Sequence, residues 1–187
     1  MQTEQNGAVN TASNTNLDST RLWLAQKIEA SLPKTLILDR TPQTIKLIQE
    51  RYKLARQHAK INIAPADEKQ FFEDLLDEIL GFGPLEKVLN DDTVTEVMVN
   101  RADLVYIEKK GKLIESGVTF VNDDHVERVI RKIIEPLGRY VGRDSPLVDA
   151  RLPDGSRVNA VVSPCAIDGP NITIRKFSTN PFGTQDL

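Results

Sequence analysis

The sequence has few of the residues that form disulfides or bind metals. It contains one cysteine, Cys165, and two histidines, His58 and His125, among 187 residues. One cysteine excludes an internal disulfide and a zinc site built from several cysteines. Cys165 lies in the loop "SPCAIDGP" with no histidine nearby to activate it, so we expect a small packed thiol rather than a nucleophile. We expect His125 at the surface, in the first turn of a helix.

A long apolar run, an excess of basic residues and a phosphate loop are also missing. No apolar segment approaches the length of a membrane span, and the N-terminus has no basic-then-apolar leader pattern. The formal net charge of −3 argues against sequence-independent binding of nucleic acid. No Gly-x-x-x-x-Gly-Lys-Ser/Thr segment occurs, which excludes a phosphate-loop nucleotide site within this chain. A cytoplasmic protein without a nucleic-acid partner is therefore expected.

Two compositional segments form the N-terminal part of the chain. Residues 1–18 are rich in Asn, Thr, Ser and Gln and cannot bury enough apolar surface, so we expect a disordered tail there. A tether to a partner is the alternative. Residues 19–83 carry three amphipathic stretches that predict a small helical bundle. Thr41 can cap the second helix, and Pro42 suits its first position.

Residues 84–178 show short strand-like runs separated by turns, with one long helical stretch, "DDHVERVIRKIIEPLG". Within that stretch, Asp124 and Glu127 match a capping box. Strands that follow one another through short turns, with one helix inserted, predict an antiparallel sheet with a helix packed on it. The expected fold class is therefore α+β, a helical bundle followed by this sheet.

The stretch "DARLPDGSRVNA" predicts a hairpin that carries one arginine on each side of its turn. Alternate residues of a strand share a face, so Arg151 and Arg157 lie together on the side away from their apolar neighbours. Arg175 of "ITIRKF" falls on the same side by the same alternation. Asp154 and Gly155 are the residues expected to shape the turn.

Two explanations fit three arginines on one polar face. The simpler one is a solvated face, with pairing to Asp149 and Asp154 across the strands. The other is a bound phosphate, because the planar fork of arginine matches phosphate oxygens. No complete catalytic constellation is present, so this chain by itself is not expected to be an enzyme.

Four blocks, occurring in order, carry a resemblance to a known family: "GFGPLEKVLNDDTVTEVMVN", "VYIEKKGKL", "SPLVDARLPDGSRVNAVVSP" and "DGPNITIRKF". Together they resemble the secretion ATPases of tight-adherence (Flp) pilus systems, the CpaF family within the type II and type IV secretion ATPases. The resemblance covers roughly residues 66–187. It implies a PAS-like domain at 84–178 in a homo-hexameric, ATP- and magnesium-dependent motor. Such motors work peripherally at the cytoplasmic side of the inner membrane and contact the platform proteins of the pilus.

In complete members of that family a RecA-like ATPase domain with the phosphate loop follows. Residues 179–187 are then expected to be a linker toward a missing ATPase domain, and this fragment alone would bind neither ATP nor magnesium. The resemblance assigns phosphate contacts to Arg151, Arg157 and Arg175, with Arg143 as a less well matched candidate. It thereby shifts the preference from a solvated face to a phosphate-contacting one. The alternative is a PAS-like sensory or protein-interaction module with no nucleotide role, which needs a ligand pocket inside the sheet.

Overall fold

The computed structural model describes the backbone of residues 6–33 and 39–177, and side chains from residue 17 onward. The chain divides between Pro84 and Leu85 into two compact units. From the sequence, this division is expected one residue earlier, where the pattern changes from helical to strand-like. Residues 179–187, the expected linker, lie outside the described residues.

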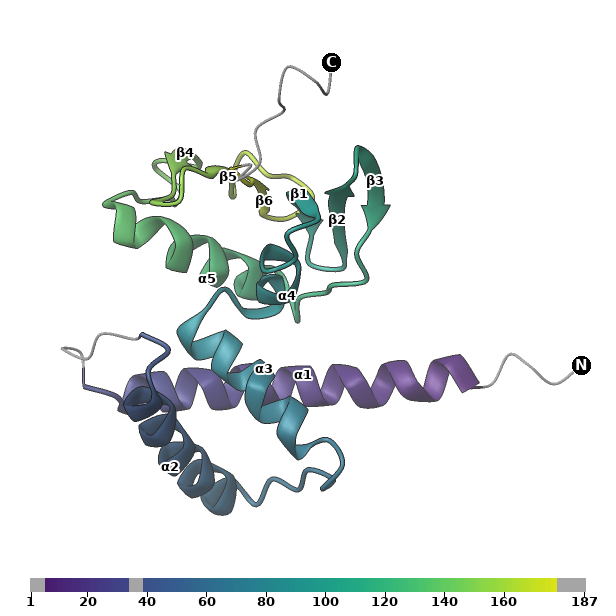
Figure 1. Ribbon diagram of the computed structural model, residues 1–187, viewed down its shortest axis with the longest axis vertical. Coiled ribbons are helices and arrows are strands. Elements are labelled where there is room, and N and C mark those ends of the chain that lie inside the picture. The colour runs from purple at the N-terminus through teal and green to yellow at the C-terminus, as the bar shows by residue number, and fades with distance from the viewer. Residues whose placement is uncertain (1–5, 34–38, 178–187) are drawn as a thin grey trace, which may run out of the picture. The chain divides into compact units, whose positions relative to one another are not determined.

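The first unit consists of three helices (Figure 1). Helix α1 packs against both α2 and α3. The bounds are α1 (Asn6–Ser31), α2 (Pro42–Ala59) and α3 (Glu68–Leu80). The apolar stripes of the three helices meet in one core, whose buried members are Leu24, Ala25, Ile28, Leu32, Ile48, Tyr52, Ile63, Phe71, Leu75, Leu76 and Ile79. This arrangement is the helical bundle that the periodicity predicts.

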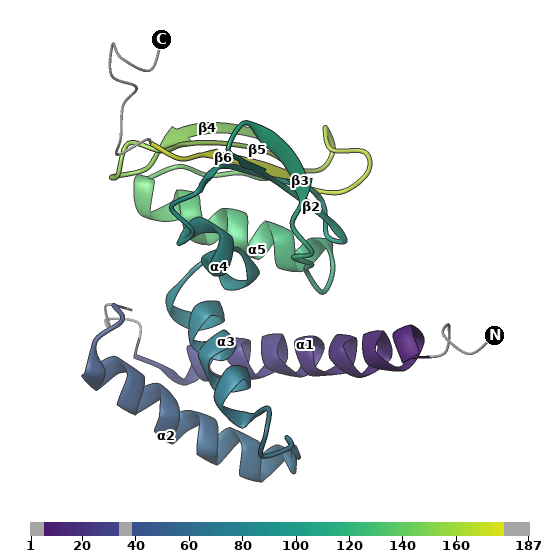
Figure 2. The ribbon, with the colours of Figure 1, turned by 45° about the vertical axis from the view of Figure 1, so that its right-hand side comes forward.

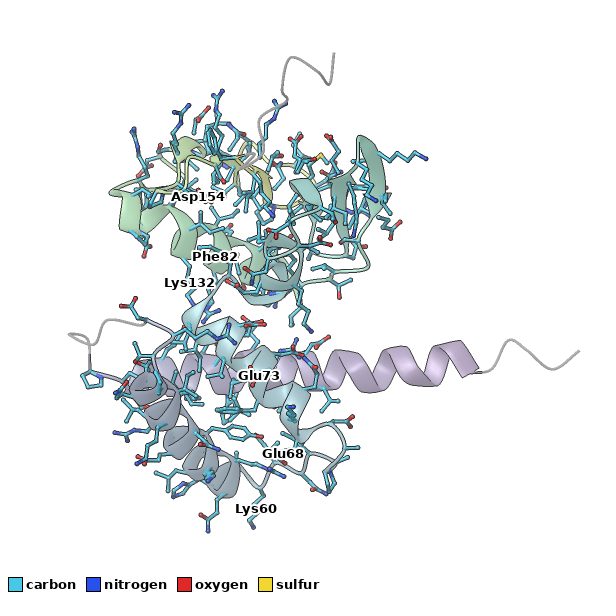
Figure 3. All side chains as sticks on the ribbon, viewed as in Figure 1. Lys60, Glu68, Glu73, Phe82, Lys132 and Asp154 are labelled. Carbon is cyan, nitrogen blue, oxygen red and sulfur yellow. The ribbon has the colours of Figure 1, made fainter. Side chains whose placement is uncertain are left out.

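Helix α2 begins as its sequence predicts. The Thr41 hydroxyl accepts a hydrogen bond from the backbone N–H of Thr44 at 3.2 Å, and Pro42 occupies the first helical position. At the other end Lys60 adopts a left-handed conformation with φ of 52°, which stops the helix (Figure 3). The cap satisfies backbone groups that the helix itself leaves without partners.

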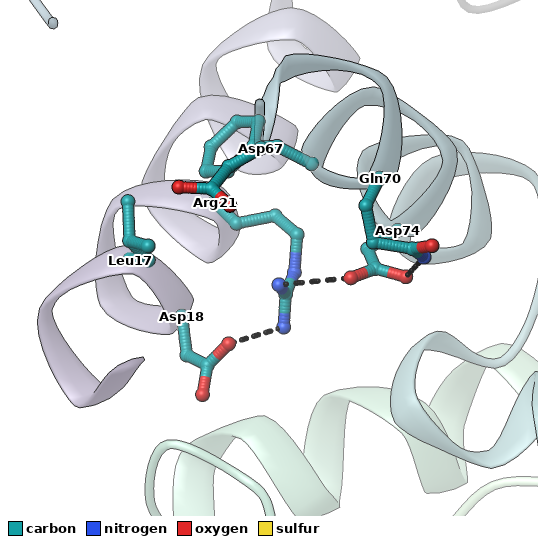
Figure 4. A pocket seen from close by; sticks show the side chains of 7 residues that line it. Leu17, Asp18, Arg21, Asp67, Gln70 and Asp74 are labelled. Atoms are coloured by element: carbon teal, nitrogen blue, oxygen red, sulfur yellow. Dashed lines mark hydrogen bonds and ion pairs between the residues drawn. The ribbon is translucent and has the colours of Figure 1, made fainter. Parts of the chain in front are cut away.

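An arginine on α1 joins it to α3 by ion pairs. Arg21 contacts Asp18 of its own helix at 2.7 Å and Asp74 of α3 at 3.4 Å, beside a pocket at the α1–α3 contact (Figure 4). A second cross-helix pair joins Arg56 of α2 to Glu68 at the start of α3. These pairs fix how the helix surfaces are oriented toward each other around the apolar core.

The structure differs from the expected disordered tail over residues 6–18, which form the first turns of α1. Packing of the segment after Leu17 holds the helix in place. Each residue added before it then gains a backbone hydrogen bond without a new nucleation cost, even where the side chains favour disorder. Residues 1–5, the beginning of that expected tail, lie outside the described residues.

The second unit is built on a six-stranded sheet with strand order β3-β2-β1-β6-β5-β4. All neighbouring strands are antiparallel. The strands are β1 (Val94–Arg101), β2 (Leu104–Lys109), β3 (Lys112–Glu115), β4 (Leu147–Arg151), β5 (Arg157–Val161) and β6 (Asn171–Arg175). With the helices, this sheet confirms the predicted α+β fold class.

Helix α5 (Asp123–Ile134) covers one face of the sheet (Figures 1 and 2), while the short helix α4 (Glu86–Leu89) precedes β1. Alternate strand residues point toward α5 and meet its apolar stripe. The buried residues of this layer include Val97, Val99, Val158, Ala160, Ile172, Ile174, Val126, Val129, Ile130, Ile133 and Ile134. Among the described residues of this second unit, no helix lies on the opposite face of the sheet in the two views.

The start of α5 corrects two expectations. Its N-cap is Asn122, whose side-chain oxygen accepts from the backbone N–H of His125 at 2.9 Å. The predicted capping box fails because the helix starts two residues earlier than that box requires, and Glu127 instead pairs with Arg131. His125 is buried rather than at the surface, with its ring edge against Phe120.

Cys165 is exposed, contrary to the expected packed thiol. Its backbone N–H donates to the carbonyl of Val162 at 3.1 Å in a turn between β5 and β6. The turn places the cysteine outside the layer of alternating buried residues, so its side chain faces solvent.

Candidate functional site

Three arginines lie side by side across the open face of the sheet. Arg151 of β4 is directly opposite Arg157 of β5, and Arg157 is directly opposite Arg175 of β6. Directly opposed residues of antiparallel strands have Cα atoms about 4.5–5.5 Å apart. All three side chains are exposed. We call this set, Arg151, Arg157 and Arg175, the arginine row.

The face of the row is set by alternation in the three strands. In β4 the buried residues are Val148 and Ala150, which flank Asp149 and precede Arg151. The same pattern holds in β5 and β6, where the buried positions also alternate with exposed or half-buried ones. Because burial occurs on the α5 side, the arginines project from the opposite face.

The row carries positive charge with little compensation. Arg157 pairs with Asp149 at 3.4 Å, but the two side chains are 64% and 60% exposed. Such an exposed pair contributes about 0–1 kcal/mol. Among the described residues no hydrogen bond or ion pair engages the guanidinium of Arg151 or Arg175. Like charges placed directly opposite each other destabilise a sheet, so an anion on this face would relieve the repulsion.

The same line across the sheet continues as acidic residues. Arg175 is opposite Glu96 of β1, and Glu96 is opposite Glu108 of β2. The positive surface therefore ends at β6, and the neighbouring strands present carboxylates. An anion would be held over β4, β5 and β6 and repelled from β1 and β2.

The turn between Arg151 and Arg157 is held by its own side chains. Asp154 accepts from the backbone N–H of Ser156 and from its hydroxyl, both at 2.9 Å (Figure 3). Gly155 has φ of +90°, a left-handed conformation that favours glycine. The sequence identifies Asp154 and Gly155 as turn residues but misses Ser156, which is 2% exposed. The signal for it was the Asp-x-Ser spacing of a side-chain-stabilised turn.

The chain leaves β6 at the end of the sheet where the arginine row lies. Arg151 ends β4, and Arg175 ends β6. Just beyond, the Lys176 ammonium donates to the backbone carbonyl of Asp91 at 2.8 Å, and the Phe177 N–H donates to the Ser156 hydroxyl at 3.1 Å. The segment following β6 is thus attached both to the start of the sheet and to the turn.

A carboxylate beside this attachment is kept ionised. Asp91 accepts hydrogen bonds from the Thr93 hydroxyl and from the Lys109 ammonium, the latter at 2.9 Å. These contacts, with the Thr93 hydroxyl first, hold the pKa of Asp91 well below its usual range. Asp91 therefore contacts two lysines: its ionised carboxylate binds Lys109, and its backbone carbonyl binds Lys176.

Arg143 is not brought to the row. It lies before β4, in a tight turn where Gly142 and Ser145 exchange backbone hydrogen bonds of 3.0 Å. Arg151 is at the opposite end of β4, and four residue steps of strand span roughly 13 Å. The structure therefore groups three of the four candidate arginines.

Two other features of the described residues concern metal binding and membrane spanning. No group of three or more His, Cys, Asp or Glu side chains among them could hold a metal ion. In the same part of the chain, the helices include none both long and apolar enough to cross a membrane.

One pocket lies beside Arg21, and another lies along the β5–β6 loop near Cys165. The layer between α5 and the sheet is lined by buried apolar side chains, and the sensory-module alternative, which needs a ligand pocket there, stays a prediction.

Comparison with known proteins connects this fold to a family. Residues 78–187 match the model of the family described as type II/IV secretion system protein. An uncharacterised protein of Methanocaldococcus jannaschii is 39% identical over 107 residues, which cover 56% of this chain and 15% of that protein. A putative conjugal transfer protein of Mycobacterium tuberculosis is 29% identical over 116 residues, which cover 59% of this chain and 32% of that protein.

A solved structure is also similar. It is the VirB11 ATPase from the Brucella suis type IV secretion system in complex with sulphate, with 28% identity and a TM-score of 0.49. The similarity covers 55% of this chain and 32% of that one. The chain thus spans a third or less of the length of each of these proteins.

Proposed function

The chain belongs to the family of type II/IV secretion system proteins, and from this premise we propose that it is the N-terminal region of a secretion motor ATPase. The motor would be of the tight-adherence (Flp) pilus type, the CpaF family. In this proposal the arginine row contacts the phosphates of ATP held by a RecA-like domain that lies beyond this chain. The chain alone does not hydrolyse ATP.

The observation that carries the proposal is the arginine row itself. Three guanidinium groups share one face at the end of the sheet where the chain continues, and two of them have no partner among the described residues. The planar fork of arginine donates two parallel hydrogen bonds to phosphate oxygens. A polyphosphate delivered by the following domain would neutralise charges that otherwise repel one another.

The role of these residues in turnover is electrostatic. ATP supplies the phosphoryl group, and magnesium would be held by the ATPase domain. Positioned guanidinium groups stabilise the charge on the transferring phosphoryl oxygens. Asp154 and Gly155 act indirectly, because they hold the turn that keeps Arg151 opposite Arg157. Arg143 is left out of this proposal because it lies at the other end of β4.

The family also suggests an assembly and a location. The proposed partners are neighbouring subunits of a homo-hexamer and the platform proteins of a pilus system, at the cytoplasmic side of the inner membrane. The family match and the name of the mycobacterial relative, a putative conjugal transfer protein, support a secretion or transfer machine. Gel filtration with light scattering on the longer protein, with and without ATP, tests the hexamer.

The proposal is tested first in the gene and then in the enzyme. The reading frame must continue past Leu187 into a segment with a phosphate loop. In that longer protein Arg157→Ala should lower ATP turnover about tenfold or more, with Arg157→Lys recovering only part of it. Arg139→Ala, at an exposed arginine outside the row, is the matched control. Full turnover in Arg157→Ala, or an equal loss in the control, rejects the arginine role.

A further inference from the structure

Ser156 connects two segments that meet at one end of the sheet. Its hydroxyl donates to the Asp154 carboxylate at 2.9 Å and accepts from the Phe177 N–H at 3.1 Å. The side chain is nearly inaccessible, with 2% exposure. One hydroxyl thus bridges the turn that carries two arginines and the first residues after β6.

A second contact joins the same two segments. A Cβ atom built on Gly155 would lie 3.2 Å from the ring of Phe177, so ring and turn are in close contact. Phe177 is nevertheless 64% exposed, and no buried core within the described part of the chain holds its ring. Its position therefore depends on the turn and on the Ser156 hydroxyl.

The segment is also fixed on its other side. The Lys176 N–H donates to the Thr95 carbonyl at 2.9 Å, and the Lys176 ammonium donates to the Asp91 carbonyl at 2.8 Å. The segment 176–177 therefore runs between the start of β1 and the β4–β5 turn, with a hydrogen bond to each.

We propose that Ser156 is a positioning residue that couples the direction in which the chain leaves the sheet to the placement of Arg151 and Arg157. This inference rests on the proposed function, because it needs a following domain that moves. When the following domain pulls on Phe177, the hydroxyl transmits the displacement to the turn. The two arginines at the ends of that turn then shift relative to the phosphates, which makes their contact dependent on domain position.

The coupling itself is tested in the 187-residue chain without nucleotide. Ser156→Ala removes both hydrogen bonds of the hydroxyl with almost no change of volume. The Phe177 amide loses its acceptor, and its hydrogen exchange, followed by NMR, should accelerate about tenfold or more. Ser145→Ala, which removes an exposed hydroxyl at the other end of β4, should leave that rate unchanged. An unchanged Phe177 rate in Ser156→Ala overturns the coupling.

The consequence for turnover is tested by a double-mutant cycle in the longer protein. Ser156→Ala should lower kcat/KM for ATP on the order of fivefold in the wild-type background, the effect of one net hydrogen bond. It should have a clearly smaller effect when Arg157 is already Ala, because part of its action passes through that arginine. A general structural defect would give equal losses in both backgrounds, and that result overturns the positioning role. Ser156→Thr, which keeps the hydroxyl, should restore most of the rate.

The two proposals fail in different ways. If Arg157→Ala leaves turnover unchanged, the proposed function fails, while the exchange result on Phe177 still stands. If Arg157→Ala lowers ATP turnover and Ser156→Ala leaves it unchanged, the proposed function stands and the coupling is wrong. Should Ser156→Ala not fold, Phe177→Pro removes the donor N–H at an exposed position instead. It should give the same background-dependent loss of kcat/KM, and equal losses in both backgrounds overturn the coupling there too.

Discussion

Arg151 and Arg157 face each other directly across the β4–β5 hairpin, although both side chains are positively charged and only one has an acidic partner. Pairs of opposite charge stabilise facing strand positions, and like charges destabilise them. The hairpin therefore gives up some stability to keep two guanidinium groups together. Such a local conflict between charge and fold is typical of a site that binds something.

Replacing Arg151 by Gln should stabilise the second unit. Arg151 has no partner among the described residues, so its removal relieves repulsion with Arg157 without breaking a pair. We expect the free energy of unfolding to rise by about 0.5 kcal/mol at low salt. The rise should be smaller at 1 M salt, where charges are screened over about 3 Å. Urea unfolding at the two salt concentrations measures it. Arg139→Gln serves as control, and destabilisation by Arg151→Gln would contradict the repulsion.

Replacing Ile174 by Ala should destabilise the second unit strongly. Ile174 is 1% exposed and lies opposite Val97 and Val158, both fully buried. Truncation of a packed isoleucine costs about 2–5 kcal/mol, since it leaves a cavity. Thr173→Ala on the open face of the same strand should cost less than about 1 kcal/mol. Urea denaturation compares the two, and similar costs would mean that the faces of β6 are misassigned.

Loss of the α5 cap gives a separate prediction. Asn122→Ala removes the acceptor for the His125 N–H and should cost about 1 kcal/mol. Asp124→Ala, at the position of the capping box that the sequence suggests, should cost only a few tenths through the helix dipole. Thermal unfolding followed by circular dichroism ranks the two variants. A larger effect at Asp124 would restore the capping-box assignment.

The pKa of Asp91 gives a prediction about acid. Its folded-state pKa lies below the unfolded value, so ionised Asp91 contributes stability above the ordinary carboxylate range. That contribution is lost as the pH falls through the folded-state value. Thr93→Val removes the leading hydrogen bond, so the NMR titration midpoint of Asp91 should rise toward the usual range. Thr95→Val, whose hydroxyl contacts the Glu108 carbonyl instead, should leave that midpoint in place.

The sheet and the face of the arginine row could be predicted because they depend on local alternation. In β4 and β5 the apolar residues occur at every second position, and only one pairing across the turn puts both sets on the same side. Arg175 follows from the same rule in β6. That Arg157 lies directly opposite both Arg151 and Arg175 could not be predicted, because it depends on the register of three strands, which the structure provides.

Other features depend on contacts between residues distant in the sequence. Ser156 is functional in our proposal only because Phe177, 21 residues later, returns to it. His125 is buried because Phe120 folds back against its ring. Residues 6–18 are helical through continuation of a packed helix, whereas composition favours a tail. At His125 and over residues 6–18, packing overrides the local preference on which the prediction from sequence rested.

The strand order places β1 and β6, the first and last strands of the sheet, next to each other at its centre. A force applied through Lys176 and Phe177 would therefore act along a strand that is hydrogen-bonded on both sides, to β1 and to β5. Pulling along such a strand strains both ladders at once instead of opening them bond by bond. The pairing of β6 on both sides thus makes the second unit resistant to traction applied at the C-terminal end of that strand.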